Sequence, residues 1–166
     1  MPHRQALLPV FADLQASPLG ETISGSSWMF PTIETLHVFA LTVVAGTILI
    51  VDLRLLGLAS KEQRVTALSK TFLPWTWGAF AAAVVTGVLL FASRAGDYSA
   101  IPQFVFKFVV MGLAGLNMAA FHFVTWRTVG DWDIGPPVAG AKIAGALSLL
   151  SWAVIILLGR TVGFIL

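Results

Sequence analysis

The chain has 166 residues, of which 57% are hydrophobic and 11% are charged. Soluble domains usually carry about 25% charged residues, so a water-soluble globule of this composition would have too little polar surface to cover itself. Ten Lys and Arg against eight Asp and Glu give a net charge of only +2, which excludes a nucleic-acid-binding surface. The absence of cysteine excludes disulfides, thiolate metal sites and iron–sulfur clusters.

Residues 1–27 precede the first long apolar stretch, and we expect them to form a periplasmic interfacial segment. Its apolar residues recur on roughly one face of a helix: Leu7, Leu8, Val10, Phe11 and Leu14. Such a pattern predicts a short helix that lies against the outer leaflet of the membrane.

Residues 28–166 contain four apolar stretches, each close to the length of about 20 residues that a transmembrane helix needs. We predict spans at about residues 31–57, 72–92, 103–126 and 138–158, joined by short polar loops. The expected fold is therefore all-α: an integral membrane four-helix up-down bundle with a short N-terminal interfacial helix.

Basic residues indicate the orientation of this bundle. Six of them flank one side of the membrane and four flank the other, and the richer side is expected to be cytoplasmic. The six are Arg54, Lys61, Arg64, Lys70, Arg127 and Lys142. Both termini are then predicted to be periplasmic.

Ionisable residues inside the predicted spans indicate function, because each costs about 2.5 kcal/mol or more in hydrocarbon. In the first span, Glu34, His37 and Asp52 share one broad helical face. In the third span, residues at helical spacing form one stripe: Lys107, Met111, Gly115, Met118 and His122. The fourth span offers a matching stripe: Ala141, Gly145, Ser148, Trp152, Ile155 and Gly159.

Depth separates these residues into two layers. With Pro31 and Pro102 aligned at the outer surface, His37 lies about 9 Å deep and His122 about 30 Å deep. One haem held by both imidazoles is therefore excluded. The outer layer contains Glu34, His37, Lys107 and Met111, and the inner layer contains Asp52, Asn117, Met118 and His122.

An imidazole partnered by a second His or a Met is a usual way to hold haem in a helical bundle. His37 with Met111 is the best candidate ligand pair, and His122 is a further candidate. Residues expected around the ligands are Glu34, Lys107, Asp52, Asn117 and Arg54. The alternative is structural: a Glu34–Lys107 ion pair, an Asp52–His122 hydrogen bond between helices, and methionines that only fill space.

The stretches Trp28–His37 (WMFPTIETLH) and Val51–Gly57 (VDLRLLG) resemble a family of small, uncharacterised bacterial four-helix membrane proteins. More distantly, they resemble HemJ-type protoporphyrinogen oxidases and CopD-like copper-resistance membrane proteins, in which an arginine follows near the far end of the first helix. The HemJ resemblance implies haem b ligated by His37, with Met111 as its partner.

We therefore predict a haem b protein of the bacterial inner membrane that acts in electron transfer beside a quinone or a periplasmic redox partner. One alternative is copper handling, with His37, Met111, Met118 and His122 as successive ligands. Another is a non-catalytic structural or assembly subunit. As an enzyme, it would be a haem-dependent membrane oxidoreductase of the HemJ type. A homodimer would bring two His37 residues to one iron.

Overall fold

The structure is a computed structural model that describes residues 2–165, and the side chains from residue 9 onward. This part of the chain is built of helices and contains no strand. The helices are α1 Pro2–Gln15, α2 Pro18–Gly25, α3 Met29–Leu55, α4 Val65–Ser93, α5 Ala95–Ala100, α6 Pro102–Phe123, the 3₁₀ turn η1 Thr125–Thr128, α7 Val129–Trp132 and α8 Ala139–Ile165. The all-α prediction is confirmed.

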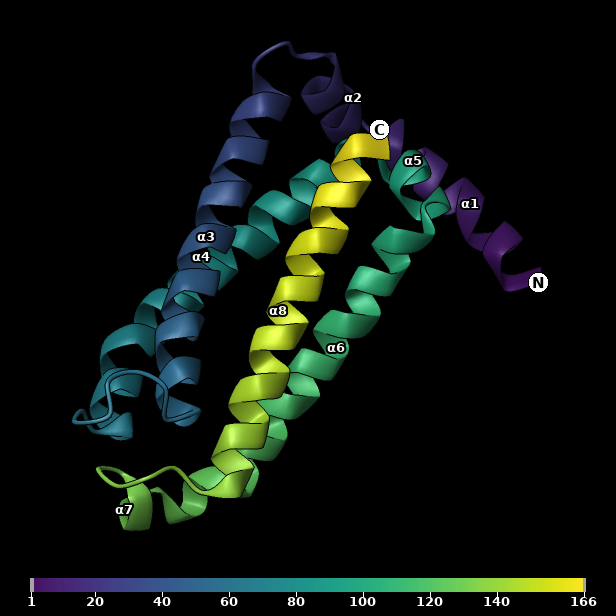
Figure 1. Ribbon diagram of the computed structural model, residues 1–166. Coiled ribbons are helices and arrows are strands. Elements are labelled where there is room, and N and C mark those ends of the chain that lie inside the picture. Colours follow the sequence, from purple (N-terminus) through teal and green to yellow (C-terminus); the bar gives the residue numbers. More distant parts are fainter. Residues whose placement is uncertain (1, 166) are drawn as a thin grey trace.

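The four long helices form two antiparallel pairs. Helix α3 packs mainly on α4, α6 packs mainly on α8, and the α3–α8 contact joins the two pairs (Figure 1). The short helices α1, α2 and α5 lie at the same end as the C-terminal end of α8, and the α3–α4 and α6–α8 connections lie at the other (Figure 1). We call the latter the loop end.

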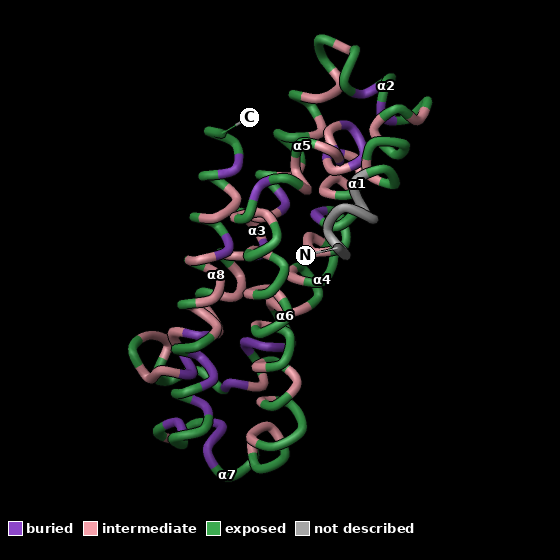
Figure 2. Tube along the Cα trace, turned by 90° about the vertical axis from the view of Figure 1, so that its right-hand side faces the viewer, coloured by how far each residue is buried: buried purple, intermediate pink, exposed green. Residues whose placement is uncertain are grey.

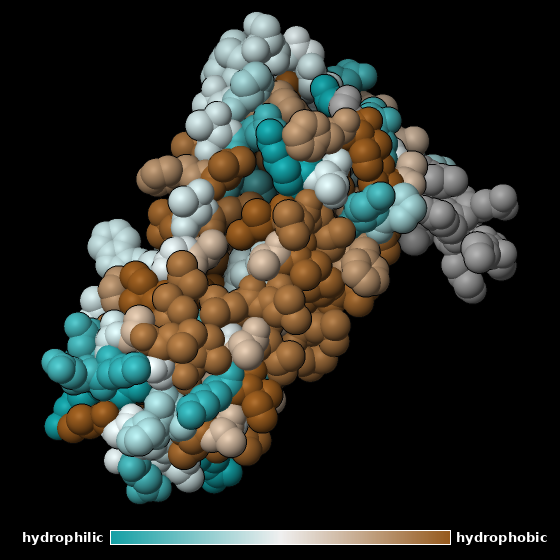
Figure 3. Space-filling view, in the orientation of Figure 1, coloured by the Kyte–Doolittle hydropathy of each residue, from teal (hydrophilic) through white to brown (hydrophobic). Residues whose placement is uncertain are grey.

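The surface of this bundle has the polarity of a membrane protein. Four helical segments are long and apolar enough to cross a bilayer: Met29–Leu55, Val65–Ser93, Pro102–Trp132 and Ala139–Ile165. Apolar side chains cover the middle of the face in Figure 3, and polar ones gather towards its two ends. Buried residues mostly lie near the ends as well, while the middle is largely exposed (Figure 2). Exposed apolar surface between polar ends is what a surrounding bilayer requires.

Two of the expected span boundaries shift. Helix α4 begins at Val65, seven residues before the expected start at residue 72, and α8 continues to Ile165. The earlier start of α4 has a tertiary cause, because Asp133 from the α6–α8 connection caps its first turn. The Asp133 carbonyl accepts from Val65 N at 3.0 Å, and Asp133 Oδ1 accepts from Thr66 N at 2.9 Å.

A buried arginine holds the loop end together. Arg54, 1% exposed, donates to the carbonyls of Gln63 at 2.8 Å, Asp133 at 3.1 Å and Gly135 at 3.3 Å. Its guanidinium thus ties the end of α3 to both connections. We call Arg54 and Asp133, with the groups they bind, the loop-end clasp. It lies beside a core of Leu55, Val65, Trp132 and Ala141.

The α3–α8 contact depends on a glycine. A Cβ added at Gly145 of α8 would lie 3.1 Å from the Asp52 carbonyl oxygen and 3.2 Å from Leu55 Cβ. Ala141, Gly145 and Ile155 of the predicted α8 stripe are buried. The stripe is therefore a packing surface that lets two helix backbones approach closely.

The N-terminal segment contains two helices instead of one. Ser17 ends the loop after α1 and caps α2, with its Oγ accepting from Gly20 N at 3.2 Å. Gly20 is required there, because a Cβ would lie 2.9 Å from the Ala92 carbonyl oxygen of α4. Helix α2 therefore packs closely against α4.

Candidate functional site

His37 lies at the α3–α4 contact with one ring nitrogen already bound. Its Nδ1 is 2.9 Å from Thr86 Oγ1 of α4, and the Ala83 carbonyl is a second acceptor nearby. Thr86 Oγ1 donates its own hydrogen to the Ala82 carbonyl at 2.7 Å, so it accepts from His37. Nδ1 therefore carries the proton, and the neutral ring has its lone pair on Nε2.

The His37 ring has room because Gly87 follows Thr86. A Cβ at Gly87 would lie 3.1 Å from His37 Cε1, which is tighter than ordinary van der Waals contact. The residue is half-buried, and within the described residues no hydrogen bond reaches Nε2. The fold therefore presents one imidazole lone pair inside the membrane-spanning region.

Lys107 brings a positive charge towards this imidazole. Its side chain crosses α8 at Gly159, where a Cβ would lie 3.4 Å from Nζ, and its charge acts on His37. The expected ion pair with Glu34 is wrong, because no such bond forms within the described part of the chain. Glu34 is exposed, and its charge acts on Tyr98 of α5.

Met111, the predicted second ligand, lies one helical turn after Lys107 on α6 and is half-buried. His37 points towards α4, however, and α3 packs against α4 and α8 more than against α6. The structure thus places His37 and Lys107 in mutual electrostatic reach, and it shows no contact between His37 and Met111.

Two inner-layer residues lie at helix contacts. Asp52, 5% exposed, has Ser148 of α8 as its polar neighbour, and its Oδ2 is buried without a hydrogen bond. Asn117 of α6 donates from Nδ2 to the Ala144 carbonyl of α8 at 2.9 Å. Asn117 therefore joins helices and has its donor occupied.

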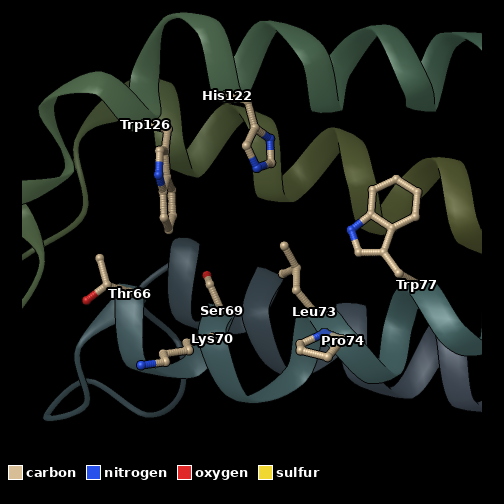
Figure 4. A pocket seen from close by; sticks show the side chains of 8 residues that line it. All are labelled: Thr66, Ser69, Lys70, Leu73, Pro74, Trp77, His122 and Trp126. Atoms are coloured by element: carbon tan, nitrogen blue, oxygen red, sulfur yellow. The ribbon is translucent and has the colours of Figure 1, made fainter.

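His122 does not bind Asp52, so that expected hydrogen bond is wrong. Its Nδ1 donates to the Met118 carbonyl of its own helix at 3.0 Å, and its ring stacks on Trp126 with centroids 5.8 Å apart. His122 and Trp126 face α4 across an open groove of about 480 Å³ (Figure 4). The α4 side of this groove consists of Thr66, Ser69, Lys70, Leu73, Pro74 and Trp77.

The two histidines lie in different layers, as their depths predicted. His37 bonds to Thr86 of α4. The α4 residues that line the groove with His122 extend only as far as Trp77. Nine residues of helix separate these positions, which is about 14 Å. No single haem iron is reached by both rings.

Arg54 lies far from His37, near the C-terminal end of α3, and its Nε and Nη2 donate within the loop-end clasp. Sequence reasoning missed Asp133 in that clasp and Thr86 beside His37. Asp133 lies in a turn-rich loop, and Thr86 precedes a glycine inside a span. Neither pattern indicates which distant residue the side chain contacts.

Within residues that the structure describes, no group of three or more His, Asp and Glu side chains could hold a bare metal ion. Met118 and His122 are exposed on α6, away from the α3–α4 contact that holds His37. Comparison of the chain with protein-family models, curated proteins and solved structures gave no match.

Proposed function

We propose that the protein is a bacterial inner-membrane haem b protein that carries electrons, with His37 as an axial ligand of the iron. The observation that supports this is the contact between His37 Nδ1 and Thr86 Oγ1, which favours the tautomer with its proton on Nδ1. Ligand histidines commonly donate their second ring N–H to an oxygen acceptor, which orients the ring and leaves the other nitrogen for the metal. Thr86 supplies that acceptor at 2.9 Å.

His37 offers one nitrogen donor that would hold a haem, and the haem would supply one-electron chemistry when bound. Thr86 holds the proton on Nδ1, and Gly87 leaves space for the ring. The Lys107 ammonium acts on His37 from α6, and a nearby positive charge favours the reduced state of a redox centre. Met111, in the same layer, is the proposed second ligand, with His37 of a second copy as the dimeric alternative.

The experiment is expression with ample haem, followed by absorption spectra of the purified protein. We expect a Soret band in the wild type that is lost in His37→Ala and retained in His122→Ala. His122 is a matched control because it is also a membrane-span imidazole with Nδ1 bonded and its other nitrogen open. A colourless wild type, or equal bands in all three proteins, would refute the proposal.

A protoporphyrinogen assay on the same preparation separates a carrier from an enzyme. The resemblance to HemJ-type oxidases favours turnover, and an electron carrier would show none. Retention of the Soret band without turnover would limit the proposal to electron transfer.

A second candidate function is a structural subunit of a membrane complex. It is favoured by the low burial of the third span, whose most apolar window is 6% buried, against 28% in the second span. A partner's helices would cover such a surface. This candidate predicts a colourless protein whose Asn117→Ala variant, after losing the bond to Ala144, also loses its partner.

A further inference from the structure

The groove between α4 and α6 contains polar groups that the bundle does not use. Trp77 and Trp126 form its aromatic walls, Leu73 lies on its floor, and Ser69 and His122 point into it from opposite helices (Figure 4). The groove is open to the side, where α4 and α6 do not pack as a pair. A ligand could therefore enter it from the surrounding bilayer.

Ser69 is the least expected member of this set. It is 7% exposed, yet its hydroxyl forms no hydrogen bond within the described residues. A serine inside a helix usually bonds back to the preceding turn, as Thr71 nearby does with the Ala67 carbonyl at 3.0 Å. The Ser69 hydroxyl instead points into the groove and is free to donate to a ligand (Figure 4).

Lys70, the next residue of α4, adds a positive charge to the lining of the groove, and its ammonium extends to the side below Thr66 (Figure 4). It is exposed and has no ion pair or hydrogen bond in the described part of the chain. Asp133, an acidic group of the α6–α8 connection, is already bound by Thr66 and lies 3.6 Å from Arg64. The groove therefore offers one free cation and one free hydroxyl donor, which together suit a phosphate.

His122 adds an acceptor. Its Nδ1 donates to the Met118 carbonyl, so the neutral ring has a lone pair on Nε2. That lone pair would repel a bare phosphate oxygen and would accept from an alcohol. The ligand that satisfies all three groups thus has a phosphate and a hydroxyl.

Depth indicates a lipid as the source of that ligand. The 29 residues of α4 extend over about 43 Å, longer than the hydrocarbon core of about 30 Å. A hydrocarbon core centred on α4 would leave about 6–7 Å of helix beyond it at each end, so Ser69 and Lys70, about 6–8 Å from Val65, would lie at the boundary between headgroups and acyl chains. Leu73 and Trp77 follow deeper along the groove, where an acyl chain would lie.

We propose that the α4–α6 groove at the loop end binds phosphatidylglycerol. The phosphate lies between Lys70 and the Ser69 hydroxyl, a glycerol hydroxyl donates to His122 Nε2, and an acyl chain lies along Leu73 and Trp77.

Native mass spectrometry of the detergent-solubilised protein tests this, with phosphatidylglycerol, phosphatidylcholine or soluble glycerol 3-phosphate added at equal concentration. We expect the wild type to bind phosphatidylglycerol about tenfold more tightly than phosphatidylcholine. Lys70→Gln and Ser69→Ala should each remove most of this preference. Lys142→Gln should preserve it, because Lys142 is an exposed cation one turn into α8 and lies outside the groove.

Three results would overturn the proposal. Equal losses in Lys70→Gln and Lys142→Gln would show general attraction to anionic lipid without a site. Equal binding of phosphatidylcholine and phosphatidylglycerol by the wild type would show that the headgroup is not recognised. Equal binding of glycerol 3-phosphate would identify a soluble phosphate as the ligand. His122→Phe keeps an aromatic ring beside Trp126 and should weaken phosphatidylglycerol binding about threefold.

Discussion

The loop-end clasp and the region around His37 differ in how fully their polar side chains are hydrogen-bonded within the protein. In this clasp, Nε and Nη2 of Arg54 and both carboxylate oxygens of Asp133 bind backbone or side-chain groups of the protein. Around His37, Nε2 and the Lys107 ammonium have no hydrogen bond within the described residues. Both regions lie in the same bundle and face the same cost of burying polar groups.

This difference in hydrogen bonding distinguishes polar residues that stabilise the fold from polar residues that have another role. A buried polar group with all its bonds made inside the protein stabilises the structure, and its type is explained by that role. His37 is different: its Nδ1 is bonded to Thr86, but its second ring nitrogen has no hydrogen bond in the part of the chain that the structure describes. Such a side chain is oriented for a role other than stabilising the fold. Substitutions in the two regions should therefore have unequal effects on stability.

Arg54→Met should cause the largest loss of stability. The methionine keeps most of the apolar stem but removes the donor that three carbonyls share, and the Asp133 carbonyl keeps Val65 N as its second donor. We expect this loss to cost about 3–5 kcal/mol. Thermal unfolding followed by circular dichroism in detergent measures the change. The control is Arg127→Met, which alters an exposed arginine near the same end and should have little effect. Similar unfolding temperatures for both variants would contradict the role of the clasp.

Gly145→Ala should destabilise the bundle by about 1–3 kcal/mol, because the new Cβ would lie 3.1 Å from the Asp52 carbonyl oxygen and push α3 from α8. Gly112→Ala in α6 is the matched control, since nothing lies within 4 Å of its Cβ position. Alanine should there be neutral or slightly stabilising in the purified protein. A loss at Gly112 equal to that at Gly145 would show that the α3–α8 contact is not specific.

Asp133 should make the stability of the loop end depend on pH. Burial opposes its ionisation, but the hydrogen bonds from Thr66 and the Arg64 guanidinium outweigh burial and lower the pKa of Asp133 below its usual value. The stabilisation is therefore present above about pH 4 and is lost as the pH falls through the lowered pKa.

Unfolding temperatures measured from pH 6 down to pH 3 test this. Asp133→Ala should lose about 1 kcal/mol at pH 6, which is typical for a missing helix cap. Asp133→Asn keeps an oxygen acceptor for Thr66 N and should lose less. The gap between the wild type and Asp133→Ala should shrink on acidification. A constant gap would show that the charge of Asp133 contributes nothing.

Asp52→Asn should have the smallest effect, between no change and a gain of about 1 kcal/mol. Its Oδ2 is buried without a partner, and the amide has nearly the same shape while removing a charge that is costly to bury. Comparison with Asp133→Asn under the same conditions gives the result. A marked loss in Asp52→Asn would indicate that the carboxylate binds something at the α3–α8 contact.

The sequence predicted the four spans because long apolar stretches and their polar ends are local properties of the chain. The separation of His37 and His122 into two layers also followed, since depth depends only on the rise of a helix. The sequence did not predict which residues His37 and His122 contact. Periodicity gives the face on which His37 lies, but whether α4 or α6 covers that face depends on how four helices pair.

The early start of α4 shows the same limit. Residues 65–71 have weak apolar character, and they become helical with Asp133, 67 residues away from Thr66, capping them. A cap supplied by another connection leaves no pattern near the helix it begins. Ser17-Pro18, by contrast, is a local signal for the start of α2, with a serine cap followed by proline in the first turn.

The measurement that tests the central claim most directly is the absorption spectrum of haem-replete His37→Gly with and without added imidazole, beside the wild type. We predict a Soret band in the wild type, no band in His37→Gly, and its return when free imidazole occupies the space left by the ring. A wild type without the band, or a His37→Gly variant that keeps it unaided, would contradict the assignment of His37 as the haem ligand.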